Sequence, residues 1–151
     1  MSVTNKEKNF ISAVVYLHND GAQAVRFFKA LNAVLDQHFE QYELVAFVDG
    51  FCTDMPDLTD EMYADAALHD ENGAWQMIFG VNTLPRCRCR GYAGLLLQRA
   101  IADARAQGRK GLVLTCKEKL LHYYAKFGFV NEGVSQSTHG NVAWNQMRLT
   151  F

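Results

Sequence analysis

The stretch Thr83-Leu84-Pro85-Arg86-Cys87-Arg88-Cys89-Arg90-Gly91-Tyr92-Ala93-Gly94 decides the fold. It follows an apolar segment, residues 75–82, that is typical of a buried strand. After it, apolar residues recur at helical spacing up to Gly108, namely at Ala93, Leu96, Leu97, Ala100, Ile101 and Ala104. The pattern predicts a strand, a basic turn and an amphipathic helix, with Gly108 just beyond the end of the helix.

A basic, glycine-containing turn at the start of a helix predicts an anion site. The first N–H groups of a helix have no partner within the helix, and the positive end of the helix dipole lies beside them. Arg88 and Arg90 can add charge-assisted hydrogen bonds to a phosphate. The alternative is a solvated basic loop before a core helix. Glycines at the helix start, where a backbone must approach a ligand closely, favour phosphate.

The composition is that of a globular domain. The chain has 151 residues, with 49% hydrophobic and 21% charged residues and a net charge of −1, which predicts one domain over residues 1–151. No apolar run is long enough for a membrane helix, and residues 1–9 lack the apolar core of a signal peptide. We therefore expect a cytoplasmic protein with no membrane partner. Nucleic acid is not expected either, because the chain is not basic overall.

Charge is unevenly distributed along the chain. Residues 54–71 are rich in Asp and Glu and contain no Lys or Arg, whereas residues 86–119 are rich in Lys and Arg. This asymmetry suits an enzyme that joins a cationic substrate to an anionic cofactor. On charge alone, two solvated surfaces explain it equally well.

The cysteines predict neither a disulfide framework nor a metal site. Cys52, Cys87, Cys89 and Cys116 form no Cys-x-x-Cys pair, and the histidines do not complete a familiar zinc pattern. Reduced thiols and no bound metal are expected.

Two apolar strands and a helix are expected before the decisive stretch. The strands are residues 10–17 and 42–52, and the helix is residues 22–38, with turn residues and a candidate N-cap, Asp20, before it. They predict a β-α-β unit with parallel strands and a right-handed connection. Residues 53–72 predict a loop, with a short helix around residues 60–68, that forms a candidate substrate-binding lip.

The rest of the chain predicts alternating elements. A short strand over residues 111–116 precedes a helix over residues 119–127, which ends at Gly128. A final antiparallel pair is expected over residues 129–134 and 142–151, where Met147, Leu149 and Phe151 alternate with polar residues.

From about residue 44 to residue 151 the chain resembles the GNAT superfamily of acetyl-coenzyme-A-dependent N-acetyltransferases. Residues 88–93, Arg-Cys-Arg-Gly-Tyr-Ala, match the family's R/Q-x-x-G-x-G/A signature between a strand and a helix. Residues 122–129, His-Tyr-Tyr-Ala-Lys-Phe-Gly-Phe, resemble its second landmark, a tyrosine four residues before Gly-Phe. The fold class expected is α/β (α+β): a GNAT-like mixed, largely antiparallel sheet flanked by helices, with an atypical N-terminal β-α-β segment.

The resemblance implies a reaction and its site residues. An acetyl group would pass from acetyl-CoA, a cosubstrate, to a primary amine of a small molecule or peptide by direct attack on the thioester. Tyr124 would be the general acid that protonates the departing thiolate. Main-chain groups would bind the cofactor: the pantetheine arm along Val81, Asn82 and Thr83, and the pyrophosphate at Arg88, Cys89, Arg90, Gly91, Tyr92 and Ala93.

The acceptor side is less defined. An alkylamine of pKa near 10.4 needs about 4.6 kcal/mol to lose its proton at pH 7, so a general base is expected. Family members that place the base on the strand before the signature would use Met77 or Phe79, which cannot serve here. Lys117 replaces an asparagine that touches the cofactor arm in many relatives. The base stays unassigned among Asp54, Glu61, His69 and Glu71, and the candidates to border a cationic amine are Tyr63 and Trp75.

Residues 1–50 resemble something else, the opening β-α-β of GT-A-type glycosyltransferases. Asp49 would fall near that family's first nucleotide-binding aspartate, although no Asp-x-Asp motif follows. The expected organisation is an apparent chimera, with an atypical segment over residues 1–43 and a GNAT-like region over residues 44–151. Two alternatives remain open: a non-catalytic CoA-binding or dimerising module, whose uncovered sheet edge favours a homodimer, and a truncated sugar-nucleotide-binding fragment.

Overall fold

A computed structural model describes residues 7–16 and 21–151. The helices are α1 (Gly21–His38), α2 (Tyr92–Ala106) and α3 (Leu121–Ala125). The strands are β1 (Glu7–Tyr16), β2 (Phe39–Thr53), β3 (Trp75–Thr83), β4 (Gly111–Cys116), β5 (Val130–Val134) and β6 (Asn145–Thr150). Short 3-10 turns lie between them, at η1 (Asp60–Tyr63), η2 (Ala66–Leu68), η3 (Pro85–Cys87), η4 (Glu118–Leu120) and η5 (His139–Asn141).

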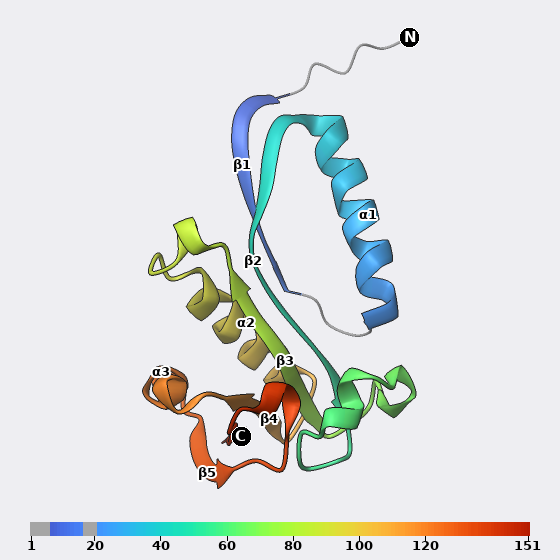
Figure 1. Cartoon of the computed structure of the whole chain (residues 1–151). Coiled ribbons are helices and arrows are strands. Elements are labelled where there is room, and N and C mark those ends of the chain that lie inside the picture. Colours follow the sequence, from blue (N-terminus) through green and yellow to red (C-terminus); the bar gives the residue numbers. More distant parts are fainter. Residues whose placement is uncertain (1–6, 17–20) are drawn as a thin grey trace.

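The strands form one six-stranded sheet in the order β1-β2-β3-β4-β6-β5. Antiparallel pairs are β2 with β3, β4 with β6 and β5 with β6, whereas β1 with β2 and β3 with β4 are parallel. The mixed, largely antiparallel sheet expected from the resemblance is therefore confirmed. So is the N-terminal β-α-β unit with its parallel strands, which adds β1 to the same sheet. Figure 1 shows α1 beside β1 and β2 at one end of the molecule, and α3 and β5 at the other.

Each face of the sheet has its own apolar core. On one face, called here the helix face, Ile78, Leu112 and Leu114 pack with Leu96 and Leu97 of α2 and with residues of α3. On the other, the loop face, a smaller cluster joins strand residues to the segment between β2 and β3, and consists of Phe51, Met77, Val113, Leu58 and Met62. Alternation of side chains along a strand produces the two sets.

Most expected elements are present with shifted ends. The helix expected over residues 22–38 is α1, the strand over residues 111–116 is β4, and β2 is longer at both ends than residues 42–52. The helix expected over residues 119–127 is instead a 3-10 turn followed by the short α3, and β6 begins only at Asn145. The turn at residues 18–20 with its expected N-cap lies outside the described residues.

The segment between β2 and β3, residues 54–74, is called here the acidic loop. It contains η1 and η2 in place of one short helix. Its ends are fixed to the sheet, since the Asp70 N–H donates to the carbonyl of Cys52 at 2.8 Å. Arg109, which is only 8% exposed, donates from Nη2 to the carbonyl of Glu71 at 3.0 Å and from Nη1 to that of Gly73. This arginine therefore anchors the loop.

Candidate active site

The parallel strands β3 and β4 separate part-way along their length. They pair from Trp75 opposite Gly111 to Ile78 opposite Leu114, and no further. Beyond that point β3 continues along β2 as far as Thr83, while β4 continues along β6 as far as Cys116. We call the region between these diverging ends the split. Within the described part of the chain, no strand pairs with either end on the side that faces the split.

The main-chain N–H and C=O groups of successive β3 residues point alternately toward β2 and toward the split. The Leu84 N–H donates to the carbonyl of Val45 at 2.8 Å, so the main chain at Leu84 faces β2. Successive residues of a strand present their N–H and C=O groups to opposite edges. Thr83 and Val81 therefore present these groups to the split, whereas Asn82 presents its groups to β2. Of the three residues expected along a pantetheine arm, two have main-chain groups in the required direction.

The turn after β3 contains two residues in the left-handed conformation. Cys89 and Gly91 have positive φ angles of 60° and 86°, separated by Arg90. Gly91 is the N-cap residue of α2, and no side chain caps this helix end. Left-handed residues next to a helix start direct successive N–H groups to one side, where an anion can accept them. The residues predicted to bind pyrophosphate thus form one turn, called here the cradle (residues 88–93).

The arginines around the cradle have different partners. Arg88 and Arg90 are exposed, and Arg88 Nε donates to the carbonyl of Thr83 at 3.3 Å, which links the cradle to the end of β3. Arg86 forms an ion pair with Glu43 of β2. Arg109, which the sequence groups with the same basic stretch, is buried beneath the acidic loop instead, so not all of this charge is available to an anion.

Tyr124 lies in the core of the helix face and is 8% exposed. Its ring meets those of Tyr123 and Phe129 edge-on, at centroid distances of 5.2 and 6.2 Å. Burial, with smaller contributions from Cys116 at the end of β4 and from Tyr123, raises the pKa of Tyr124 well above its usual range. The hydroxyl therefore stays protonated at neutral pH, as a general acid must.

The loop face of the split is aromatic and acidic. Tyr63 of η1 lies over Phe79, with ring centroids 4.7 Å apart, and stacks on His139 at 5.9 Å. Burial raises the pKa of Tyr63, and Asp60 and Asp49 raise it further, whereas a hydrogen bond with Thr115 of β4 opposes this. Tyr63 therefore borders the split, and its place beside a cationic amine stays a prediction. Trp75 does not border the split: it lies at the end of β3 that is paired with β4, under the guanidinium of Arg148 at 4.6 Å.

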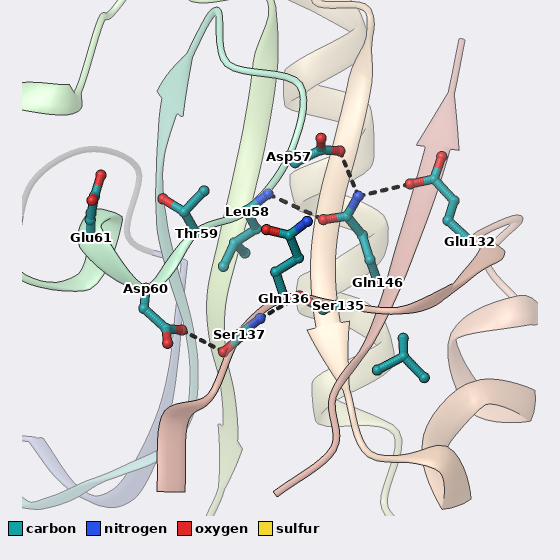
Figure 2. Close-up of a pocket in the computed structure, with 11 residues that line it drawn as sticks. Asp57, Leu58, Thr59, Asp60, Glu61, Glu132, Ser135, Gln136, Ser137 and Gln146 are labelled. Atoms are coloured by element: carbon teal, nitrogen blue, oxygen red, sulfur yellow. Dashed lines mark hydrogen bonds between the residues drawn. The ribbon is translucent and has the colours of Figure 1, made fainter. Parts of the chain in front are cut away.

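A cavity of about 530 Å³ lies between the acidic loop and the β5–β6 hairpin, and Figure 2 shows its lining. Gln146, which lies opposite Thr115 in the β4–β6 ladder, brings the cavity next to the split. Hydrogen bonds from Ser137 and then Thr138 hold the pKa of Asp60 below its usual range. The cavity lining contains four carboxylates and no Lys or Arg, with the acids at Asp57, Asp60, Glu61 and Glu132.

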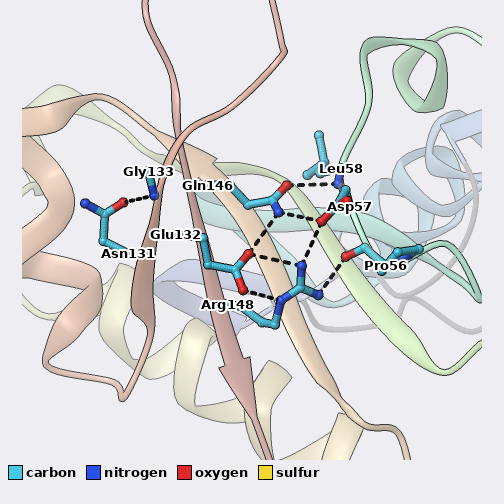
Figure 3. A network of polar contacts seen from close by, with 8 residues as sticks. All are labelled: Pro56, Asp57, Leu58, Asn131, Glu132, Gly133, Gln146 and Arg148. Carbon is cyan, nitrogen blue, oxygen red and sulfur yellow. Dashed lines mark hydrogen bonds and ion pairs between the residues drawn. The ribbon is translucent and has the colours of Figure 1, made fainter.

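A polar network fixes the acidic loop to the hairpin (Figure 3). Arg148 binds Glu132 through Nε at 2.7 Å and Asp57 through Nη2 at 2.8 Å. Gln146 donates to both carboxylates and accepts from the N–H of Leu58 at 3.2 Å. The Arg148 bonds lower the pKa of Glu132, so this carboxylate stays charged. The loop that the sequence marks as a lip is thus held against the sheet.

Of the four base candidates named from the sequence, Glu61 alone lines the cavity beside the split. Asp54 Oδ1 accepts from the Ala74 N–H at 2.9 Å, and His69 Nδ1 bonds the backbone of Cys52. Glu61 and Glu71 are exposed on the acidic loop. Another carboxylate, that of Asp49 of β2, lies opposite Gly80 of β3, the strand that borders the split. The sequence feature that could have pointed to Asp49 is that it is a single acidic residue directly after the apolar run of residues 45–48.

The cysteines form no disulfide among the described residues. Cys52, Cys87 and Cys116 are buried and Cys89 is exposed. Burial raises the pKa of the thiols of Cys52 and Cys116 to about 11 in each case. Where the structure describes the chain, no group of His, Cys, Asp and Glu is arranged to hold a metal ion.

Comparison with protein families matches the acetyltransferase (GNAT) family over residues 39–129. This is more than half of the chain and includes β2, the split, the cradle and Tyr124. The chain belongs to the GNAT family of acetyltransferases. The match begins at the first residue of β2, within the segment that also resembles glycosyltransferases. Nothing in the comparisons supports that second resemblance or a chimera.

Two solved structures share the fold of this GNAT chain with TM-scores above 0.5. The loading GNATL domain of CurA from Lyngbya majuscula has a TM-score of 0.58 at 17% identity, over 72% of this chain and 71% of that one. Ard1 from Thermoplasma volcanium has a TM-score of 0.53 at 15% identity, over 72% and 64% of the two chains. Nourseothricin acetyltransferase has a TM-score of 0.44 at 19% identity, over 51% of this chain and 50% of that one. The chain thus spans half of the nourseothricin acetyltransferase chain and 64% of the Ard1 chain.

No curated protein matches the sequence. Within the described residues, no helix has both the length and the apolar character needed to cross a membrane.

Proposed function

We propose that this GNAT acetyltransferase is an N-acetyltransferase that transfers the acetyl group of acetyl-CoA to a primary amine. The observation that carries the proposal is the split between β3 and β4, where no strand among the described residues pairs with the main chain of β3 directly before the cradle. A long ligand with an anionic end fits this arrangement. CoA has that form, because an amide-containing arm joins its pyrophosphate to the thioester.

The cradle would hold the pyrophosphate of acetyl-CoA. Residues 88–93 supply N–H groups around the uncapped start of α2, and Arg88 and Arg90 are exposed beside them. Anion binding at such a helix start needs no further group. The two arginines would add charge-assisted hydrogen bonds to the phosphates.

The pantetheine arm would lie in the split along β3. Its amides can exchange hydrogen bonds with the main chain of Val81 and Thr83, as an added strand does. Asn82 would contribute through its side chain or not at all, because its main chain faces β2. This places the thioester near the point where β3 and β4 separate.

Tyr124 would donate a proton to the sulfur as the C–S bond breaks. A phenol of pKa about 10 and a thiol of pKa about 8.5 differ by roughly 2 kcal/mol in the direction that opposes full transfer. Burial raises the pKa of Tyr124 and widens this gap. The hydroxyl therefore stabilises the leaving sulfur by a strong hydrogen bond first, and the proton moves only as negative charge develops on that atom.

The acceptor would be a cationic amine. The acidic loop carries carboxylates next to the loop face of the split, and the cavity beside it is lined by four of them. Their negative charge favours binding of an ammonium group over a neutral or anionic acceptor. A small-molecule amine or a peptide N-terminus would fit. The cytoplasmic location expected from the sequence goes with this proposal, because CoA cosubstrates are kept inside the cell.

Calorimetric titration with CoA and a thiol-release assay with acetyl-CoA and a panel of primary amines test the proposal. We predict that Tyr124→Phe lowers kcat by about 10²-fold or more, since general acid catalysis is typically worth 10²–10⁴-fold. The Kd for CoA should stay within a factor of about two, because the hydroxyl is needed only in the transition state.

The neighbouring Tyr123→Phe is the matched control and should keep kcat close to the wild-type value. If CoA fails to bind at millimolar concentration, the proposal is wrong. If Tyr124→Phe turns over at the wild-type rate, the general-acid role of Tyr124 is wrong while the CoA site stands.

A second candidate function is a CoA-binding module that dimerises without turnover. One observation favours a homodimer: β5 is an edge strand, and its Val130 and Val134 are 67% and 75% exposed. An edge strand with exposed apolar side chains can pair with a second copy. CoA binding without thiol release from any amine, together with a dimer in sedimentation, would favour this candidate over the enzyme.

A further inference from the structure

Asp49 is placed at the one irregularity of the β2–β3 ladder. Asp49 lies opposite Gly80, but the next residue, Gly50, lies opposite Ile78. Phe79 is therefore an extra residue in β3, which makes a β-bulge just beyond the last residue of β3 that pairs with β4. Bulges redirect the side chains next to them and are common beside active sites.

The Asp49 carboxylate lies directly over the backbone of β3. A Cβ added at Gly80 would be 2.4 Å from Asp49 Oδ1, so the carboxylate occupies the space that a side chain at residue 80 would take. The same point lies 3.1 Å from Nδ2 of Asn82. The carboxylate is thus held against the segment of β3 that borders the split, between Phe79 and Val81.

One oxygen of this carboxylate lacks a partner. Asp49 Oδ1 is buried and accepts no hydrogen bond in the described part of the molecule. Buried acceptors are nearly always satisfied, because an unsatisfied one costs about 1–3 kcal/mol. A substrate donor such as an ammonium or amine N–H would satisfy it. Among the described residues, the titratable group that faces Asp49 is Tyr63 of η1, while the nearby β3 residues are uncharged.

Asp49 and Tyr124 lie on opposite faces of the sheet. Side chains alternate along β2, where Val48 belongs to the helix-face core and Phe51 to the loop-face core. Asp49 is therefore on the loop face, with Tyr63 and the acidic loop, whereas Tyr124 is in the helix-face core. A thioester in the split would have a carboxylate on the side where the amine approaches and a phenol on the other side.

We propose that Asp49 is the general base that deprotonates the acceptor amine, an assignment that rests on the proposed N-acetyltransferase function. The carboxylate takes a proton from the ammonium, and the freed lone pair forms the C–N bond at the thioester carbonyl. When the tetrahedral intermediate collapses, the C–S bond breaks and its electron pair goes to sulfur, which receives the proton of Tyr124. The remaining excess proton on nitrogen restores Tyr124 through water, and Asp49 releases its proton to solvent.

The acid–base properties of Asp49 suit this role. Burial raises its pKa above the ordinary value of 3.8, against a smaller opposing effect of its own backbone N–H. A carboxylate with a raised pKa is a stronger base, and it accepts the amine proton at less cost. The loss of solvation that creates this basicity follows from the position over Gly80.

The test compares Asp49→Asn with Asp103→Asn, the same substitution at an acid of α2 that is paired with Arg99. Two kinds of acceptor are used with acetyl-CoA. Spermidine and 1,4-diaminobutane are protonated at neutral pH and need a base, whereas methoxyamine is already unprotonated. Thiol release is followed over a range of pH, and CoA affinity is measured by calorimetry for each variant.

We expect Asp49→Asn to lower kcat/KM for the alkylamines by about 10²-fold or more at pH 7. The defect should be smaller with methoxyamine, because this acceptor is already unprotonated. With the alkylamines it should shrink as pH rises, because a smaller fraction of the amine then needs deprotonation. The acidic limb of the wild-type pH profile, where kcat/KM rises as Asp49 ionises, should be absent from the variant. CoA affinity should be unchanged, and Asp103→Asn should match the wild type.

Two results would overturn the assignment: alkylamine turnover by Asp49→Asn within about threefold of wild type, or an equal defect with alkylamines and methoxyamine. Failure of the wild type itself to acetylate any amine is a different result. It removes the proposed function, and the base assignment with it.

Discussion

At the scale of single residues, the desolvated carboxylate of Asp49 has a consequence for stability. Its pKa is raised in the folded state, mainly by burial, so folding disfavours the ionised form. The folded state therefore loses stability as pH rises from the pKa of Asp49 in the unfolded chain to its pKa in the folded chain. Above the folded-state pKa this loss is complete. At neutral pH the wild type carries this loss, and an uncharged side chain of the same shape would not.

We predict that Asp49→Asn is at least as stable as the wild type at pH 7 and that any gain disappears below the ordinary pKa of 3.8. Thermal unfolding at several pH values measures this. A lower Tm of the variant at pH 7 would mean that the ionised carboxylate stabilises the fold. Combined with lost turnover, an unchanged or raised Tm would separate a chemical role from a structural one.

Residue roles were the least predictable part from the sequence. Arg109 belongs to a basic stretch, and only the folded chain shows that its guanidinium is buried against the carbonyls of Glu71 and Gly73. Asp49 is a lone acid in an apolar strand, and its position over Gly80 depends on a bulge in another strand. Both roles arise from contacts between distant segments, which no local pattern encodes.

At the scale of elements, local patterns predicted more. Of the apolar positions expected on one face of α2, Leu96, Leu97, Ala100 and Ala104 are buried, whereas Ala93 and Ile101 are half-buried. Met147 and Leu149 of β6 are buried, and Phe151 after it is half-buried. Helical and strand periodicity predict which face of an element is buried, even when the element that packs against it is not known. The point where β3 leaves β4 could not be predicted in this way, because the pairing depends on β6 and β2 as much as on either strand.

The cradle and α2 provide a prediction at this scale. Gly91 and Gly108 flank α2, both have positive φ angles, of 86° and 72°, and a Cβ would meet nothing within 4 Å at either position. Alanine at each should therefore cost about 1–2 kcal/mol through backbone strain alone. Only Gly91 lies in the cradle.

We predict that Gly91→Ala lowers CoA affinity by about tenfold, because alanine lets the free loop relax out of the left-handed conformation, and about 1.4 kcal/mol of strain to restore that conformation on binding corresponds to this factor. Gly108→Ala should lower the Tm about as much as Gly91→Ala does, but it should leave CoA affinity unchanged. Calorimetric titration and thermal unfolding of both variants measure the two effects. Equal affinity losses in the two variants would show that general destabilisation of α2, and not the cradle, is responsible.

At the scale of the whole molecule, the two charged regions of the sequence lie in different places. The acidic loop covers the loop face, next to the cavity, while the exposed Arg88 and Arg90 are at the end of β3 that leads into α2 (Figure 1). A cation and an anion would thus approach separate surfaces of one small domain. The near-neutral net charge of −1 hides this division.

Ionic strength should weaken binding of both substrates of the wild type. From about 0.1 to about 1 M salt the Debye length falls from roughly 10 to roughly 3 Å, which screens exposed charges from an approaching ligand. We predict that the KM values for acetyl-CoA and for a polyamine both rise over this range, whereas the KM for methoxyamine, which carries no charge, stays nearly constant. A salt-independent KM for the polyamine would mean that the acidic loop does not attract the acceptor, and the cationic acceptor would then have to be abandoned even if the CoA site is correct.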